Sequence, residues 1–404
     1  MKRRRAIAVL SVLMAIGGAR PVNAAGDRAW TQFGQAPEHT FENAAEHLIG
    51  PGNVSQLRFR WEASFGDGSG IAPTTAVSVA HGVVFVASAD DRVHALDAAT
   101  GQERWYAPIE GIVDSTPAVA GGLVFVGTLN GPVEAFPETC SSPCSPVWST
   151  QIGGTNSPPV IVGSRMYIGG YDGDLYALDA ATGTVLWRGS VNLFDPVNEA
   201  PTVGGGTVFV AGNLGVYAFP TDCTTPCDPL WMVRMPYTVF ASVSLAGGLV
   251  YAVDYQGDVD AIEAATGGIV WTGHIRPGPT GTAVSGGRVY VGNSWGRVSG
   301  FAATGCGTST CATVWRGTVP PVTPGLERGL FQPSVANGVL YVGSIDEIYT
   351  AGSVFAFASC DRVCEPAWSA TTDGAVEASP VVANGQLYVT TLTGNVEAFG
   401  LPSG

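Results

Sequence analysis

The chain has almost no lysine and few charged residues of any kind. Lys2 is the only lysine among 404 residues, and Asp, Glu, Lys and Arg together make up 13% of the sequence. The net charge is −14 at pH 7, and it becomes more negative without residues 1–24, which hold basic residues and no acidic one. This balance argues against nucleic acid and anionic membranes as partners. The near-absence of lysine excludes a Schiff-base mechanism.

The sequence also lacks an apolar run of the roughly 20 residues that a membrane helix needs. The apolar stretch at 6–18 follows a basic stretch and precedes the small residues at 22–24. This order is typical of a secretory signal peptide. No cysteine follows it, so we expect no lipid anchor. We predict a signal peptide at 1–24 and a mature protein that is secreted, soluble, monomeric and without a membrane anchor.

Cysteine is scarce but regularly placed. The chain has eight cysteines, in four close pairs: Cys140/Cys144, Cys223/Cys227, Cys306/Cys311 and Cys360/Cys364. An even number of cysteines in an exported chain favours disulfides. Metal binding is the alternative, but none of the five histidines lies near a pair. We expect four small disulfide loops with a structural role.

Glycine is abundant, with 55 residues, and one string of twelve residues recurs. "HALDAATGQERW" at 94–105 returns as "YALDAATGTVLW" at 176–187 and as "DAIEAATGGIVW" at 260–271. The longer unit at 157–187 alternates apolar and polar positions between Gly and Asp-Gly turns. That pattern predicts four short, half-buried antiparallel strands joined by tight hairpins.

Tryptophans mark the period of this repeat. Eight of the ten end a copy: Trp61, Trp105, Trp148, Trp187, Trp231, Trp271, Trp315 and Trp368. A period of about 40–45 residues with four strands per copy is typical of β-propeller blades. The last copy, at 379–400, has only three strands, and we expect the strand around Trp61 to complete it. The predicted fold is all-β: an eight-bladed propeller over 53–402, closed by an N-terminal strand and preceded by a lead-in at 25–52.

The repeat resembles the tryptophan-docking motif Ala-x-Asp-x-x-Thr-Gly-x-x-x-Trp of the quinoprotein-type, PQQ-like eight-bladed propellers. The copies at 95–105 and 177–187 match every fixed position, and the copy at 261–271 has Glu263 in place of the aspartate. The segments "WTQFGQ" (30–35) and "NVSQLRFRW" (53–61) are similar to the lead-in of quinoprotein alcohol dehydrogenases. The resemblance implies that the tryptophans pack between blades.

Two branches of this family imply two functions. Quinoprotein dehydrogenases bind PQQ and calcium over the channel and oxidise alcohols or sugars, whereas BamB-like propellers are cofactor-free scaffolds. This chain lacks the dehydrogenases' adjacent cysteine pair, their large insertions and a C-x-x-C-H haem motif, and it lacks BamB's lipid-anchor cysteine. We expect a cofactor-free binding or scaffold protein whose partner is a protein, a glycan or a small molecule. A dehydrogenase that uses PQQ and calcium is the alternative.

In a propeller, the residues before each inner strand and those in each turn between the second and third strands share one face around the channel mouth. We expect this mouth to be acidic and interrupted by aromatic residues at 171, 255, 295 and 349. The ligand-binding candidates are Asp114, Asn156, Glu199, Trp295, Gln332 and Glu377. Asp114, Asn156, Glu199 and Glu377 are the candidate calcium ligands; a solvated acidic rim is the alternative. Trp295 ends no blade, so it either stacks on a planar ligand or packs on a neighbouring loop.

Overall fold

The computed structural model describes residues 28–65, 75–88, 90–191, 196–321, 328–346, 352–358, 360 and 362–402. The predicted signal peptide, and the predicted mouth residues Glu347 and Tyr349, lie outside these ranges. Within them the chain is organised in strands, with the 3-10 helix η1 (Val54–Gln56) before the first blade. No helix of the described residues is both long and apolar enough to cross a membrane.

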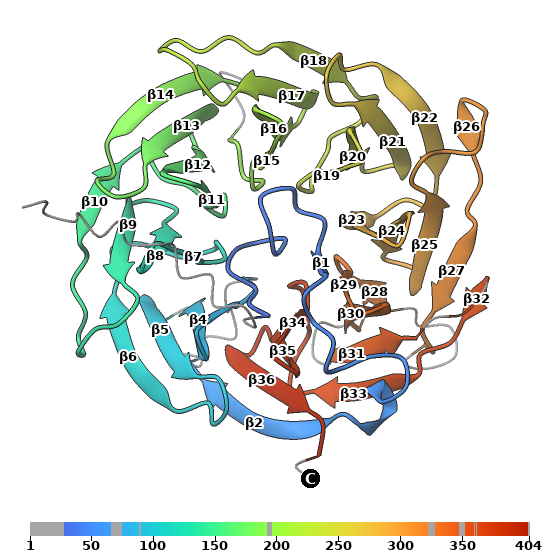
Figure 1. Cartoon of the computed structure of the whole chain (residues 1–404), viewed down its shortest axis with the longest axis horizontal. Coiled ribbons are helices and arrows are strands. Elements are labelled where there is room, and N and C mark those ends of the chain that lie inside the picture. The colour runs from blue at the N-terminus through green and yellow to red at the C-terminus, as the bar shows by residue number, and fades with distance from the viewer. Residues whose placement is uncertain are drawn as a thin grey trace, which may run out of the picture.

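Eight antiparallel meanders surround one central axis, as predicted (Figure 1). Blade 1 contains β3 (Ser78–Ala80), β4 (Val83–Ser88), β5 (Arg92–Asp97) and β6 (Glu103–Pro108). Blade 2 contains β7 (Ala118–Ala120), β8 (Leu123–Gly127), β9 (Pro132–Pro137) and β10 (Trp148–Gln151). Blade 3 contains β11 (Val160–Val162), β12 (Arg165–Gly169), β13 (Asp174–Asp179) and β14 (Val185–Ser190). Blade 4 contains β15 (Thr202–Gly204), β16 (Thr207–Gly212), β17 (Gly215–Pro220) and β18 (Trp231–Arg234).

The second half of the ring repeats this order from inner to outer strand. Blade 5 contains β19 (Ser244–Ala246), β20 (Leu249–Val253), β21 (Asp258–Glu263) and β22 (Ile269–His274). Blade 6 contains β23 (Pro279–Ser285), β24 (Arg288–Asn293), β25 (Arg297–Ala302) and β27 (Trp315–Thr318). Blade 7 contains β29 (Ser334–Ala336), β30 (Val339–Ile345), β31 (Gly352–Phe357) and β33 (Trp368–Thr372), with β28 (Gly329–Leu330) paired to β30. Blade 8 contains β34 (Val381–Ala383), β35 (Gln386–Thr390), β36 (Asn395–Gly400) and β2 (Arg58–Ser64).

The N-terminal strand closes the ring, as the missing fourth strand of the last copy predicts. β2 pairs antiparallel with β36, and Trp61 lies opposite Ala398 (Figure 1). The ring therefore holds its two ends together by a sheet and leaves no open blade edge at the junction.

The strands are more deeply buried than the alternating pattern indicates. All six residues of β4 are buried, and so are the four central residues of β13, including Tyr176. The reason is that each sheet packs against a neighbour on both of its faces. Alternation along a strand therefore separates two apolar interfaces rather than an apolar face from a solvated one.

The tryptophans lock neighbouring blades together, as the family resemblance implies. The indole nitrogen donates a hydrogen bond of 3.0–3.2 Å to a carbonyl oxygen of the next blade in seven cases: Trp61, Trp105, Trp148, Trp187, Trp231, Trp271 and Trp368. Trp315 packs edge-on against Phe357 of the next blade, with ring centroids 6.0 Å apart. Each indole thus adds a directed contact to an apolar interface.

The rest of the repeated motif builds the turn on which the indole docks. Asp179 Oδ1 accepts hydrogen bonds from the backbone nitrogens of residues 181 and 182 and from Thr182 Oγ1, at 2.9–3.1 Å. Gly183 then adopts φ = +71°, and a Cβ atom there would lie 2.5 Å from the ring of Trp148 in the preceding blade. Asp, Thr and Gly therefore recur because together they shape a tight turn with room for a ring.

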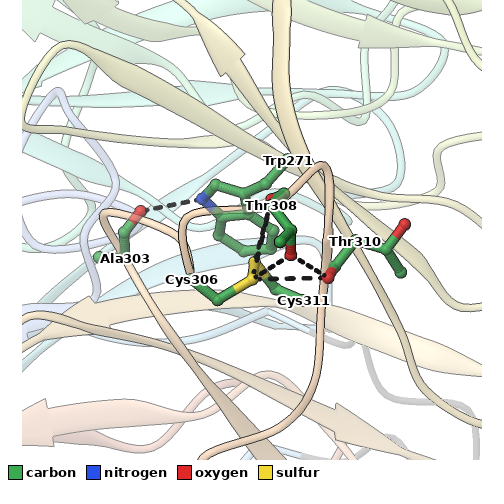
Figure 2. The surroundings of a disulfide bond; sticks show 6 residues. All are labelled: Trp271, Ala303, Cys306, Thr308, Thr310 and Cys311. Carbon is green, nitrogen blue, oxygen red and sulfur yellow. Dashed lines mark hydrogen bonds between the residues drawn. A yellow bond between two sulfur atoms is a disulfide. The ribbon is translucent and has the colours of Figure 1, made fainter.

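The four predicted disulfides are present, and each closes the outer hairpin of a blade that lacks the Asp-Thr-Gly turn. The hairpins of blades 2 and 4 donate Cys144 N–H and Cys227 N–H to the outer strands of blades 1 and 3. Those of blades 6 and 7 add the short parallel strands β26 (Thr310–Cys311) and β32 (Val363–Cys364) to β22 and β27. Figure 2 shows one hairpin beside Trp271, whose indole donates to Ala303. The disulfide hairpins therefore cover exposed strand edges.

The lead-in winds once around the inside of the ring (Figure 1). Its backbone carbonyls accept hydrogen bonds of 2.7–2.8 Å from the penultimate residue of six inner strands: Val79, Val119, Val203, Leu245, Val284 and Val335. Gln32 Oε1 accepts the equivalent bond from Ile161, and Asn43 Nδ2 donates to Val382. β1 (Glu42–Asn43) pairs with β29. The segment thus satisfies the inward-facing edge of all eight blades, which no sequence pattern indicates.

We predict that Gly183→Ala lowers the free energy of unfolding by about 2–4 kcal/mol, because a left-handed backbone and a clash with Trp148 act together. Urea denaturation followed by tryptophan fluorescence measures the change. Gly163→Ala is the matched control, since Gly163 has φ = +59° in the same blade but nothing within 4 Å of the added atom. An equal loss in both variants would show that the docking contact contributes nothing.

Candidate functional site

One face of the propeller carries most of the predicted site residues. This upper face consists of the segments that lead into the inner strands and the turns between the second and third strands. Backbone hydrogen bonds join the two sets, for example Leu129 N to Ile112 O at 2.8 Å and Tyr255 N to Thr238 O at 2.9 Å. The candidate residues therefore lie on a common surface, although they come from six blades.

Glu199 lies just before β15 and keeps limited contact with solvent. Ser242 Oγ donates to its Oε2 over 3.4 Å. This long hydrogen bond does not offset the loss of hydration at the narrow end of the blades, so burial raises the pKa of Glu199 to about 8. At neutral pH the side chain is largely a protonated acid, which donates a hydrogen bond rather than carrying a charge.

Glu377 and Asp114 precede the inner strands of blades 8 and 2, on either side of blade 1. Burial raises the pKa of Glu377, and the negative charge of Asp114 raises it further. The two carboxylates are therefore close enough to repel each other across the mouth. Asp114 and Glu377 thus give the mouth an acidic region between blades 8 and 2.

The two candidate amides have different surroundings. Gln332 is buried, and its Nε2 donates to Thr282 O of blade 6 over 3.0 Å, so this side chain joins two blades. Asn156 is half-buried, and its Oδ1 accepts no hydrogen bond from any residue that the structure describes. Gln332 thus uses its amide nitrogen to join blades, whereas Asn156 has a buried oxygen that no described residue satisfies.

The three candidate carboxylate ligands, Asp114, Glu199 and Glu377, do not gather into one cluster. Calcium takes six to eight oxygen ligands at short range. In the described ranges no three His, Cys, Asp or Glu side chains come close enough to share an ion, and Asp114, Glu199 and Glu377 are no exception. Asp172, one of the predicted mouth residues, is a turn residue that accepts from Tyr176 Oη at 2.5 Å. These residues as they stand do not fit the calcium site of the dehydrogenase interpretation.

The aromatic residues of the upper face are strongly exposed. Phe240 and Tyr255 have 63% and 54% of their surface exposed and meet edge-to-face, with centroids 5.8 Å apart. Tyr237 on the same blade is 51% exposed. Trp295 is 45% exposed, and the Arg276 guanidinium lies 5.4 Å from its ring centroid. Phe240, Tyr237 and Tyr255 form what we call the aromatic patch.

Sequence reasoning missed part of this surface. Tyr237 lies in an irregular segment before β19, where no periodicity distinguishes an exposed side chain from a buried one. Sequence reasoning also did not single out three arginines that line one groove, namely Arg276, Arg297 and Arg316. Aligning the third strands of the blades could have found Arg297, because blades 3 and 5 have Asp174 and Asp258 at that position.

We predict that Glu199→Gln stabilises the protein at high pH only. The carboxyl releases its proton near pH 4.5 when unfolded and near pH 8 when folded, so its stabilisation is full below pH 4.5 and disappears as the pH rises through 8. Above pH 8 the free energy of unfolding of the variant should be about 2 kcal/mol higher than that of the parent. Below pH 4.5 the two free energies should be equal. Urea titrations at both ends measure this. Glu365→Gln, at an exposed site, should show no such pH dependence.

Known proteins resemble this chain in sequence and fold. The outer membrane protein assembly factor BamB of Burkholderia pseudomallei is 26% identical over 354 residues, covering 84% of this chain and 87% of the relative. The quinoprotein alcohol dehydrogenase PedH of Pseudomonas putida is 26% identical over 258 residues, covering 57% of this chain but 39% of the dehydrogenase.

Solved structures support the same fold. The quinohemoprotein alcohol dehydrogenase of Comamonas testosteroni superposes with a TM-score of 0.73 at 15% identity, covering 94% of this chain and 81% of that one. The family described as "Outer membrane protein assembly factor BamB" matches residues 18–139, 145–222 and 226–307, which is more than half of the sequence. The chain belongs to this family of PQQ-like propellers.

Proposed function

We propose that this protein is a cofactor-free scaffold outside the cytoplasm, and that it holds another protein against its upper face. The aromatic patch is the observation that carries the proposal. Three large aromatic side chains stay half exposed on one blade, while the aromatic residues at the blade interfaces are buried. Exposed aromatic clusters of this kind are typical of protein-binding hot spots.

The surroundings of the patch favour a macromolecular partner. Tyr237, Phe240 and Tyr255 are each more than half exposed, so a small ligand would bury little of its own surface there. The acidic groups of the mouth lie on the same face, which suits a partner with basic residues around an apolar contact. The relatives named as assembly factors support a scaffold role. The disulfides support an oxidising compartment.

The dehydrogenase interpretation is the competing function. The similarity to PedH supports it, whereas the dispersed carboxylates of the mouth do not fit a calcium-bound cofactor. A reaction on PQQ needs the cofactor to be held by residues that converge on it. Asn156 has a buried oxygen without a hydrogen-bond partner, but no cluster of three acidic side chains lies in the described structure to hold an ion beside it.

Calorimetric titration of PQQ into the protein, with and without Ca²⁺, tests the absence of a cofactor. We expect no binding heat under either condition, because the described residues of the mouth include no cluster of three acidic side chains that could hold an ion. Calcium-dependent binding at micromolar concentration would contradict the scaffold proposal, and alcohol oxidation with an artificial electron acceptor would then be the assay to run.

Site-specific photo-cross-linking tests the binding face. A benzophenone side chain in place of Tyr255 should yield one discrete protein adduct in cells that export the chain, and Phe240→Ser should abolish that adduct. Placing the probe at Val185, which is exposed on the outer strand of blade 3, is the matched control and should yield none. Equal labelling from both positions, or adduct formation that Phe240→Ser leaves unchanged, would refute the role of the patch.

A further inference from the structure

A cationic groove runs between blades 5 and 6 in this acidic protein. It has a volume of about 330 Å³, and its basic lining residues are His274, Arg276, Arg297 and Arg316. Asn293, Ser299 and Thr313 contribute polar atoms to its wall. None of the described residues that line it is acidic. The groove therefore has a charge opposite to that of the chain as a whole.

Strand register explains why the arginines meet. In blade 6, Arg316 lies opposite Ser299, and Arg297 lies opposite Thr318. Arg297 and Arg316 are therefore diagonal neighbours on one face of the sheet, with Cα atoms about 7–8 Å apart. Arg276 follows β22 of blade 5 and reaches the same groove from the other side, where the ring of Trp295 supports its guanidinium.

These arginines have no acidic partner in the described part of the chain. The ion pairs of the described residues involve other arginines and histidines, and no carboxylate lies within 4 Å of Arg276, Arg297 or Arg316. His274 is different, because its Nδ1 lies 2.8 Å from Asp258 Oδ1 of its own blade. Three guanidinium groups thus stay available to an anion.

The position of Ser299, directly opposite Arg316, is acidic in three other blades. Glu134, Asp260 and Glu397 occupy the place that Ser299 takes in blade 6. In blade 8, Glu397 even faces Glu62 across the strand pair. At the positions of Arg297 and Arg316, blade 5 has Asp258 and Thr272 instead. The arginines of blade 6 are therefore not required by the fold.

The groove continues along the outer rim. A second groove of about 460 Å³ shares Thr313 and Arg316 with the first and adds Arg362. Val314 and Val363 line it and are 43% and 70% exposed. Together the two grooves form a track that alternates guanidinium groups with apolar side chains, from Trp295 on the upper face to β32 on the rim.

We infer that this track binds an extended acidic peptide segment, in which carboxylates alternate with apolar side chains. Guanidinium groups bind carboxylates through paired, charge-assisted hydrogen bonds. The exposed valines and the indole of Trp295 offer apolar contacts that suit peptide side chains, and Trp and Arg dominate protein-binding hot spots. A nucleic acid is disfavoured by the net charge of −14.

The track shares no lining residue with the aromatic patch, although its upper end adjoins it: Gly278 N–H, two residues after Arg276, donates to Tyr255 O over 3.2 Å. The inference rests on the arginines of the track and not on the proposed function. Loss of cross-linking at Tyr255 would leave it standing, and loss of peptide binding would leave the patch standing.

Fluorescence anisotropy with a labelled synthetic peptide of alternating glutamate and valine tests the inference on the full chain. The peptide should bind the parent protein, and added salt should weaken binding. Arg297→Gln and Arg316→Gln should each raise the Kd at least about tenfold, the loss expected for one charge-assisted contact. Arg316→Lys keeps the charge but not the paired donors, so it should raise the Kd by a smaller factor than Arg316→Gln.

The controls separate the track from general charge effects. Arg288→Gln removes a positive charge from the same blade outside both grooves and should leave the Kd unchanged. A peptide with glutamine in place of glutamate should not bind. Failure of the glutamate peptide to bind, or a Kd that neither groove variant changes, overturns the inference. Binding of polygalacturonate but not of the peptide also overturns it, in favour of a glycan track. Arg316 is exposed, so its variants keep the test valid if Arg297→Gln fails to fold.

Discussion

The docking of one indole per blade onto the next blade is the contact on which the rest of the structure depends. A four-stranded sheet has two apolar faces and cannot bury either alone. The ring of tryptophan contacts, from Trp61 on blade 8 to Trp368 on blade 7, places a large apolar group and a directed hydrogen bond at these interfaces. Cys144, Cys227, Cys311 and Cys364 pack into the same interfaces as the tryptophan of the preceding blade. The blade junctions therefore contain both the apolar core and one cysteine of each disulfide hairpin.

A fold held in this way leaves its faces and grooves free to differ. The turn that receives the indole needs only Asp, Thr and Gly, or a disulfide hairpin in their place. Exposed residues between these fixed points are not needed for blade packing, and neighbouring blades can therefore present opposite charges at equivalent positions. The carboxylates facing each other in blade 8 and the arginines of blade 6 show this. Binding surfaces on this scaffold are properties of individual blades, and they do not follow from the family fold.

The features that could be predicted from the sequence are those set by residues that repeat in every blade or in several blades. Counterparts of Trp187 and Gly183 recur at regular spacing along the chain, and the cysteines come in four close pairs. The blades, the closure by β2 and the disulfides could therefore all be predicted. The mouth positions were predictable too, but not their chemistry: Gln332 joins two blades. Among the described residues Asp114, Glu199 and Glu377 do not form one three-carboxylate cluster, although Asp114 and Glu377 are close enough to interact. The arginine track depends on the register of Arg297 against Arg316 and on Arg276 from the adjacent blade. Such contacts leave no local pattern.

The winding of residues 30–43 through the centre bears on the order in which the molecule can be completed. Asn43 bonds Val382, which is 339 residues away, and Arg28 bonds Asn384. The segment that leaves the ribosome early therefore finds its final partners only after blade 8 has been synthesised. Contacts of such long range close slowly. Residues 30–43 are synthesised before the blades that surround them, and they can form all their hydrogen bonds only when the whole chain is available. The closed ring is therefore a product of the complete polypeptide and not of its growing N-terminal part.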